Sequence, residues 1–171
     1  MAKKITFILI VAIFGSSSAF SQLNRTIHDE TKGKDILYGF CTREAIENND
    51  GGWFKSEYET YEVKTKTFNF DLPEKFDSVY VFMGTWCENS KREIPRFCKI
   101  FDLDYFNGIP ITFICVNGKG TVDVVDVDEY YVQYFPTIIF FKKGEELCRI
   151  LEQPRTESLE SDIMDLMERM Q

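Results

Sequence analysis

Thiol chemistry is the chemistry that this sequence can perform most readily, because its 171 residues include five cysteines and a single histidine. Cys87 stands between two segments of different character. Ser78–Met83 is a β-rich apolar run, and Glu88–Phe101 has apolar residues at helical spacing. Unpaired N–H groups and the macrodipole at a helix N-terminus stabilise a thiolate. We therefore predict that Cys87 is the reactive sulfur.

Charged neighbours of Cys87 could tune its reactivity. Lys91 and Arg92 lie in the first turns of the predicted helix, where their positive charges would stabilise the thiolate, while Glu88 would oppose them. The alternative is that both cations are simply solvated. One histidine is too few for a His-rich metal site, and we expect no cofactor.

The other cysteines differ in what they could do. Cys98 lies eleven residues further along the same helix, about 16 Å from Cys87 at ~1.5 Å per residue, too far for a disulfide. Cys115 and Cys148 fall in apolar strand patterns and are predicted to be inert core residues. Cys41, at the start of a predicted first helix, could pair, resolve a disulfide at Cys87 or stay free.

Two motifs carry a resemblance to the thioredoxin superfamily. Residues 86–90, Trp-Cys-Glu-Asn-Ser, match its Trp-Cys-x-x-Cys active site, except that serine replaces the second cysteine. Pro95 matches the helix-kinking proline of that family, and residues 134–145 are similar to its cis-proline strand and following hairpin. The resemblance covers residues 77–171, and the motif is typical of exported bacterial thioredoxin-like proteins with a Cys-x-x-Ser site.

The resemblance implies roles for particular residues. Cys87 would attack a disulfide as the catalytic thiolate, with Ser90 beside it in the active-site motif. A cis peptide bond at Phe135–Pro136 would expose the backbone of Phe135 beside the thiolate, and this edge, with Trp86, would bind an extended substrate strand.

Two departures from the family pattern limit this reading. Ser90 cannot resolve a mixed disulfide, and Val81 occupies the place where many thioredoxins have a buried acid. The leading hypothesis is therefore a monothiol reductase or isomerase that is released by an external thiol or by the substrate's own second cysteine. The rival is a redox-inactive module that binds peptides or proteins. A Cys-His hydrolase would need His28 to reach Cys87, and no oxyanion motif accompanies it.

The N-terminus predicts export. Lys3 and Lys4 precede an apolar run, Ile5–Phe14, and small residues follow up to Ser21, after which we predict cleavage of a signal peptide. The run has half of the ~20 residues that span a bilayer, so no stable membrane anchor is expected. The protein should act in the periplasm or outside the cell on protein thiols and disulfides, with an unknown thiol donor. Its net charge of -8 argues against nucleic-acid binding.

The mature chain should begin with a linker and an N-terminal helical extension over residues 22–76. Residues 22–35 are polar and predict a mobile leader that contains His28. Residues 40–49 predict a short helix, and the spacing of Phe54, Tyr58 and Tyr61 predicts the core-facing stripe of a second helix. Residues 64–70 alternate in part, which indicates an edge strand.

Residues 77–171 should form the thioredoxin-like domain. After the strand and helix around Cys87, the sequence predicts strands at 111–116, 136–141 and 147–151, and an amphipathic helix from Leu159. The expected fold is α/β, with a central mixed sheet flanked by helices. Residues 117–134 have no clear pattern, and their acidic side chains lack a calcium-loop spacing, so we expect a solvated loop: Asp123, Asp126, Asp128 and Glu129.

Overall fold

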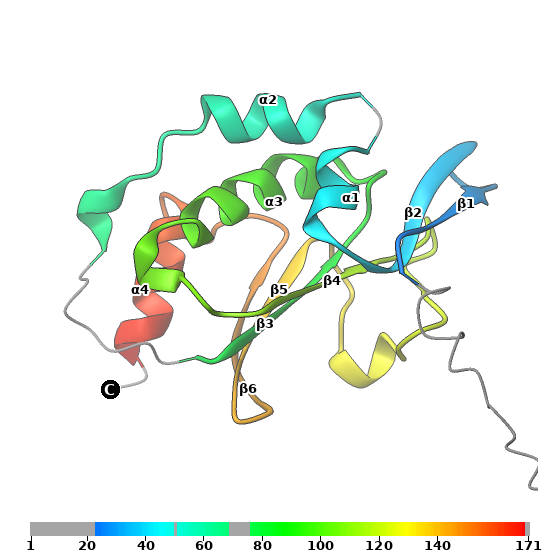
Figure 1. The fold of residues 1–171 in the computed structure, drawn as a ribbon. Coiled ribbons are helices and arrows are strands. Elements are labelled where there is room, and N and C mark those ends of the chain that lie inside the picture. Colours follow the sequence, from blue (N-terminus) through cyan, green and yellow to red (C-terminus); the bar gives the residue numbers. More distant parts are fainter. Residues whose placement is uncertain (1–22, 50, 69–75, 170–171) are drawn as a thin grey trace, which may run out of the picture.

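One mixed sheet organises the protein, as the computed structural model of residues 23–49, 51–68 and 76–169 shows (Figure 1). Its six strands follow the order β1-β2-β4-β3-β5-β6, and β3 and β4 form the parallel pair. The strands are β1 (Arg25–Asp29), β2 (Lys34–Cys41), β3 (Ser78–Met83), β4 (Ile111–Cys115), β5 (Thr137–Lys142) and β6 (Glu145–Leu151).

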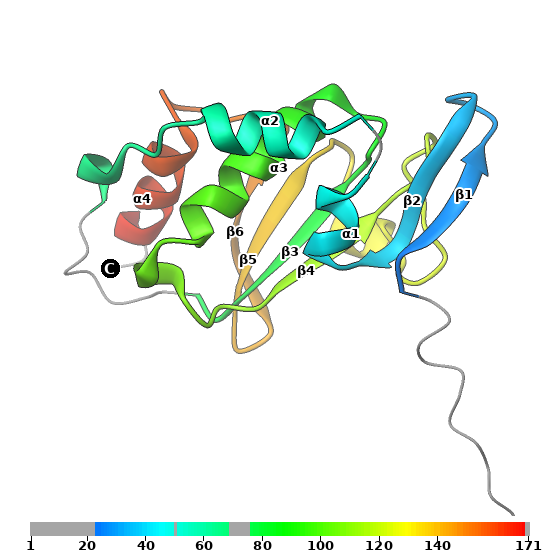
Figure 2. The same ribbon diagram turned by 45° about the horizontal axis from the view of Figure 1, so that its top comes forward.

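Helices cover one face of this sheet, and α2 lies along α3 on the side away from the strands (Figure 2). They are α1 (Arg43–Glu47), α2 (Trp53–Thr60), α3 (Glu88–Phe101) and α4 (Leu159–Arg169). Short 3-10 turns occur at Thr65–Thr67, Asp104–Phe106 and Asp128–Tyr130. The predicted α/β class, with a central mixed sheet and flanking helices, is confirmed.

The sheet is buried on both faces, as the continuous apolar run of β3 predicts. Val79, Val81 and Met83 point into a core shared with α3 and α4, and Phe82 points into a second core on the opposite face. In α2, Phe54 is buried while Tyr58 and Tyr61 pack partly buried against the first core, which confirms the predicted core-facing stripe.

The mobile leader predicted for residues 22–35 is wrong. Strands β1 and β2 form an antiparallel hairpin, and β2 continues the sheet through its pairing with β4. The turn is held by the Asp29 carboxylate, and Gly33 adopts a positive φ of 62°. A polar hairpin has little apolar alternation, so its pairing with a distant strand is invisible in the local pattern.

The predicted start of the first helix is also wrong, because α1 begins at Arg43, three residues after the predicted residue 40. Cys41 is the last residue of β2, and the side chain of Thr42 caps α1 by accepting a hydrogen bond from the Ala45 N–H. Residues 65–67 form a 3-10 turn instead of the predicted edge strand, because the Lys64 N–H donates to the Glu160 carboxylate and not to a neighbouring strand.

The predicted signal peptide, residues 1–21, lies outside the described residues, as do residues 69–75. Among the helices of the described part of the chain, none has the length and apolar character required to cross a membrane.

Candidate functional site

Cys87 caps the N-terminus of α3, as predicted, and its side chain is partly exposed. It makes no side-chain capping bond, so the sulfur is left to face the loop before β5. The thiol donates to the carbonyl oxygen of Phe135 at 3.2 Å, and the Phe135–Pro136 peptide bond is cis. The structure therefore brings Cys87, Phe135 and Pro136 together at the end of the parallel strand pair.

Trp86 is held on several sides beside this sulfur. Its indole N–H donates to the Val116 carbonyl oxygen at 3.0 Å, and its ring meets the Phe135 ring edge-on, with centroids 6.1 Å apart. A Cβ on Gly84 would lie 2.5 Å from the indole, so only glycine fits beneath it. The fourth neighbour is the Nζ of Lys32, 4.0 Å from the ring centroid.

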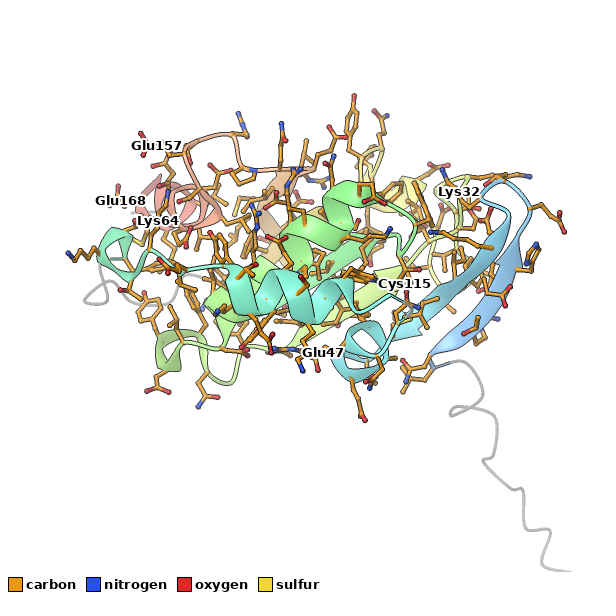
Figure 3. The ribbon with its side chains drawn as sticks, turned by 90° about the horizontal axis from the view of Figure 1, so that it is seen from above. Lys32, Glu47, Lys64, Cys115, Glu157 and Glu168 are labelled. Atoms are coloured by element: carbon orange, nitrogen blue, oxygen red, sulfur yellow. The ribbon has the colours of Figure 1, made fainter. Side chains whose placement is uncertain are left out.

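Lys32 is a site residue that sequence reasoning missed. It belongs to the turn of the β1–β2 hairpin, at the far side of the molecule from α4 (Figure 3). No local signal points to this position, because the contact joins residues 32 and 86 through the tertiary fold. Since Lys32 of the hairpin contacts Trp86, the N-terminal extension is part of the candidate site.

A buried carboxylate fastens the hairpin to the site. Asp29 accepts hydrogen bonds from the N–H groups of Thr31, Lys32 and Gly118 and from the Thr31 hydroxyl. Mainly the hydrogen bonds from Thr31 and Gly118 lower the pKa of Asp29 to about 2. The hairpin turn and the loop after β4 are therefore joined through one ionised side chain.

Ser90 is fully buried one turn into α3, where its hydroxyl accepts a hydrogen bond from the Gly84 N–H at 3.3 Å. This contact fixes the loop that carries Trp86 and Cys87. Ser90 thus occupies the place of a resolving thiol but supports the loop through a hydrogen bond.

Lys91 and Arg92, which the sequence predicts to stabilise the Cys87 thiolate, both form ion pairs with neighbouring carboxylates. Lys91 pairs with Glu88 at 2.6 Å, and Arg92 pairs with Glu93 at 2.6 Å while it also reaches Gln153. Their charges are therefore partly compensated by these acids.

The remaining thiols lie in the interior or at its margin. The Cys41 thiol donates to the Gly39 carbonyl oxygen, and its proximity to the Cys115 thiol, together with burial, raises the pKa of Cys115 well above its ordinary value. Burial raises the pKa of Cys98 and of Cys148 to about 12. The partner of Cys41 in this structure is Cys115, and no contact brings it to Cys87.

His28 is exposed on β1 and binds Asp35 at 2.8 Å. It makes no contact with Cys87, so the geometry offers no base for a Cys-His hydrolase. Within residues 23–49, 51–68 and 76–169, no group of three or more His, Cys, Asp or Glu side chains is arranged to hold a metal ion.

A thiol at a helix N-terminus, set against a cis-proline loop at the end of a mixed sheet, defines an α/β protein of the thiol-disulfide exchange class. Residues 59–165, more than half of the chain, match the family model Thioredoxin. The chain therefore belongs to the thioredoxin family, whose general function is of the thiol-disulfide oxidoreductase type. No curated protein matches the sequence significantly.

Proposed function

We propose that this protein is an exported monothiol thiol-disulfide oxidoreductase, a reductase or isomerase of protein disulfides. The observation that carries the proposal is the placement of Cys87. This residue is partly exposed at the N-terminus of α3, its sulfur lies 3.2 Å from the Phe135 carbonyl oxygen, and a serine stands where a resolving cysteine would act.

The exchange proceeds in two balanced steps. The Cys87 thiolate attacks one sulfur of a substrate disulfide, that S–S bond breaks, and the released substrate thiolate takes a proton from water. Since Ser90 cannot attack the mixed disulfide, an external thiol or the second cysteine of the substrate does so. A new disulfide then forms outside the protein, and Cys87 leaves as the thiolate.

The backbone of Phe135 beside Cys87 supports substrate binding. Phe135 presents its carbonyl oxygen at the sulfur, and Trp86 is held rigidly next to it. An extended substrate strand would bind along this edge through main-chain hydrogen bonds. Rigid groups lose little conformational entropy on binding, which lowers the free-energy cost of holding the substrate strand.

The test compares Cys87→Ala with wild type in insulin-disulfide reduction and in refolding of a scrambled substrate. We expect the variant to lose both activities, and Cys148→Ala, which removes another partly exposed thiol, to retain them. If Cys87→Ala equals wild type, the oxidoreductase proposal fails. If wild type binds peptides but never forms a mixed disulfide at Cys87, the protein is a binding module.

Export is tested separately, by expressing the full chain and sequencing the N-terminus of the product. We expect a periplasmic or secreted form that begins at Gln22. An uncleaved chain that stays in the cytoplasm would contradict this part of the proposal.

A further inference from the structure

The segment that connects β4 to β5 lines a cavity next to the redox site. It covers the sheet face opposite α3, where Val127 and Val132 pack against Phe82 and Ile114. Figure 1 shows its single yellow turn on that side of the strands. Between its loops lies a cavity of about 750 Å³, lined by residues 119–128, 132, 133 and 135.

This cavity is continuous with the redox site through Phe135. Phe135 lines the cavity, and its carbonyl oxygen accepts a hydrogen bond from the Cys87 thiol. Gly120, another lining residue, lies directly against the Phe135 ring, since a Cβ on it would be 3.0 Å from that ring. A polypeptide attached at Cys87 would therefore lie next to the cavity, on the other side of Phe135.

The cavity lining combines apolar and acidic groups. Its valines alternate with Asp123, Asp126 and Asp128, while Lys119 is the one basic residue of the lining. Asp123 is paired with Arg25, but Asp126 and Asp128 have no ion-pair partner within the described residues. The lining thus offers apolar surface and uncompensated negative charge.

Hydrogen bonds hold the walls of the cavity in place. The Asn117 side chain bonds Thr121 and the Lys119 N–H, and Arg149 of β6 donates to the Tyr130 carbonyl oxygen at 2.9 Å. Asp29 adds the bond to Gly118. A preformed wall lowers the entropy cost of binding.

We propose that this cavity is a specificity subsite that takes the apolar and basic side chains of an unfolded polypeptide segment next to the disulfide attacked by Cys87. The inference rests on the proposed function and adds the class of substrate to it. Folded proteins bury their apolar side chains, so an extended segment with exposed apolar groups is typical of an unfolded or misfolded substrate.

The test uses fluorescent peptides that cannot react, because serine replaces their cysteine. One peptide flanks the serine with leucine and lysine, and the other with leucine and glutamate. We expect wild type to bind the basic peptide at least about threefold more tightly, as a few weak surface ion pairs allow. The difference should shrink at high salt, which screens exposed charges.

Two double variants test whether the acidic residues of the cavity cause the preference for the basic peptide. The double change Asp126→Asn and Asp128→Asn should remove most of the preference, while Glu59→Gln with Glu62→Gln, which neutralises as many acids on the opposite side of the sheet, should keep it. Equal binding of both peptides by wild type, or an unchanged preference in the Asp126 and Asp128 variant, would overturn the subsite.

A small uncharged disulfide, hydroxyethyl disulfide, separates this inference from the proposed function. Its exchange by wild type but not by Cys87→Ala supports the oxidoreductase whatever the peptides show. No exchange with any disulfide, together with a clear preference for the basic peptide, would leave the cavity as a binding site and refute the catalytic proposal.

Discussion

At the scale of single residues, Ser90 distinguishes this protein from a dithiol thioredoxin. Its buried hydroxyl holds the Gly84 N–H, so the side chain supports the loop while it leaves Cys87 without an internal resolving thiol. Serine and cysteine have nearly the same shape, and the position lies one helical turn from Cys87. Replacing the side-chain oxygen of residue 90 with sulfur should therefore be enough to supply a resolving thiol.

Ser90→Cys should convert the protein to a dithiol enzyme. The new thiol would attack the mixed disulfide at Cys87, release the substrate without an external thiol, and leave an intrachain disulfide. We expect the trapped mixed disulfide to fall at least about tenfold in a gel assay that follows a labelled substrate. Ser90→Ala is the matched control and should still accumulate it. Equal accumulation in both variants would show that position 90 cannot reach the sulfur.

At the scale of elements, the β1–β2 hairpin contributes a residue to the candidate site. It places Lys32 over Trp86 and is fastened by Asp29, whose carboxylate accepts bonds from the hairpin turn and from Gly118. Sequence reasoning assigned this region to a leader, since nothing local shows that its turn docks on a loop almost ninety residues away.

Asp29 should make the docking of the hairpin sensitive to acid. Its pKa is lowered from 3.8 to about 2 in the folded state, so its stabilising effect is complete above pH 3.8 and is lost as the pH falls toward 2. Asp29→Asn should be less stable than wild type near neutral pH and should lose less stability across that acid range. Urea unfolding at several pH values measures this.

Glu30→Gln provides the control for Asp29, because Glu30 is an exposed acid in the same turn. Its acid dependence should follow wild type. If Asp29→Asn also follows wild type from neutral pH to acid, the Asp29 carboxylate does not hold the hairpin in the way the hydrogen bonds indicate.

At the scale of the whole molecule, the N-terminal extension and the C-terminal helix are joined through Glu160. This side chain of α4 is fully buried and accepts hydrogen bonds from the Tyr61 hydroxyl at 2.8 Å and the Lys64 N–H at 2.9 Å. Both donors follow α2, so one carboxylate connects segments almost a hundred residues apart.

Glu160→Gln should destabilise the protein by about 1–3 kcal/mol, because an amide has one acceptor oxygen for two donors and would direct an N–H at one of them. The free energy of unfolding from urea titration measures the loss. Glu168→Gln, an exposed position of the same helix, should change it by less than about 0.5 kcal/mol. A Glu160 variant as stable as wild type would show that the connection contributes nothing.

The sequence by itself determined the position of Cys87 and the elements around it. The bounds of β3 and α3 follow from local periodicity, and Cys87 is placed between them by chain order alone. Membership of the thioredoxin family rests on the same contiguous pattern, through the motif at residues 86–90 and the segment before β5. Information of this kind is local, because a helix or a buried strand is encoded within its own residues.

The tertiary structure alone decided what surrounds that sulfur. It brought Lys32 to Trp86, placed the free thiols of Cys41 and Cys115 near each other, paired Lys91 and Arg92 with carboxylates, and formed an open cavity beside Phe135. Each of these contacts depends on strand pairing or packing between segments far apart in the chain. Such pairing is selected by the energy of the complete fold, so periodicity and spacing could not reveal it.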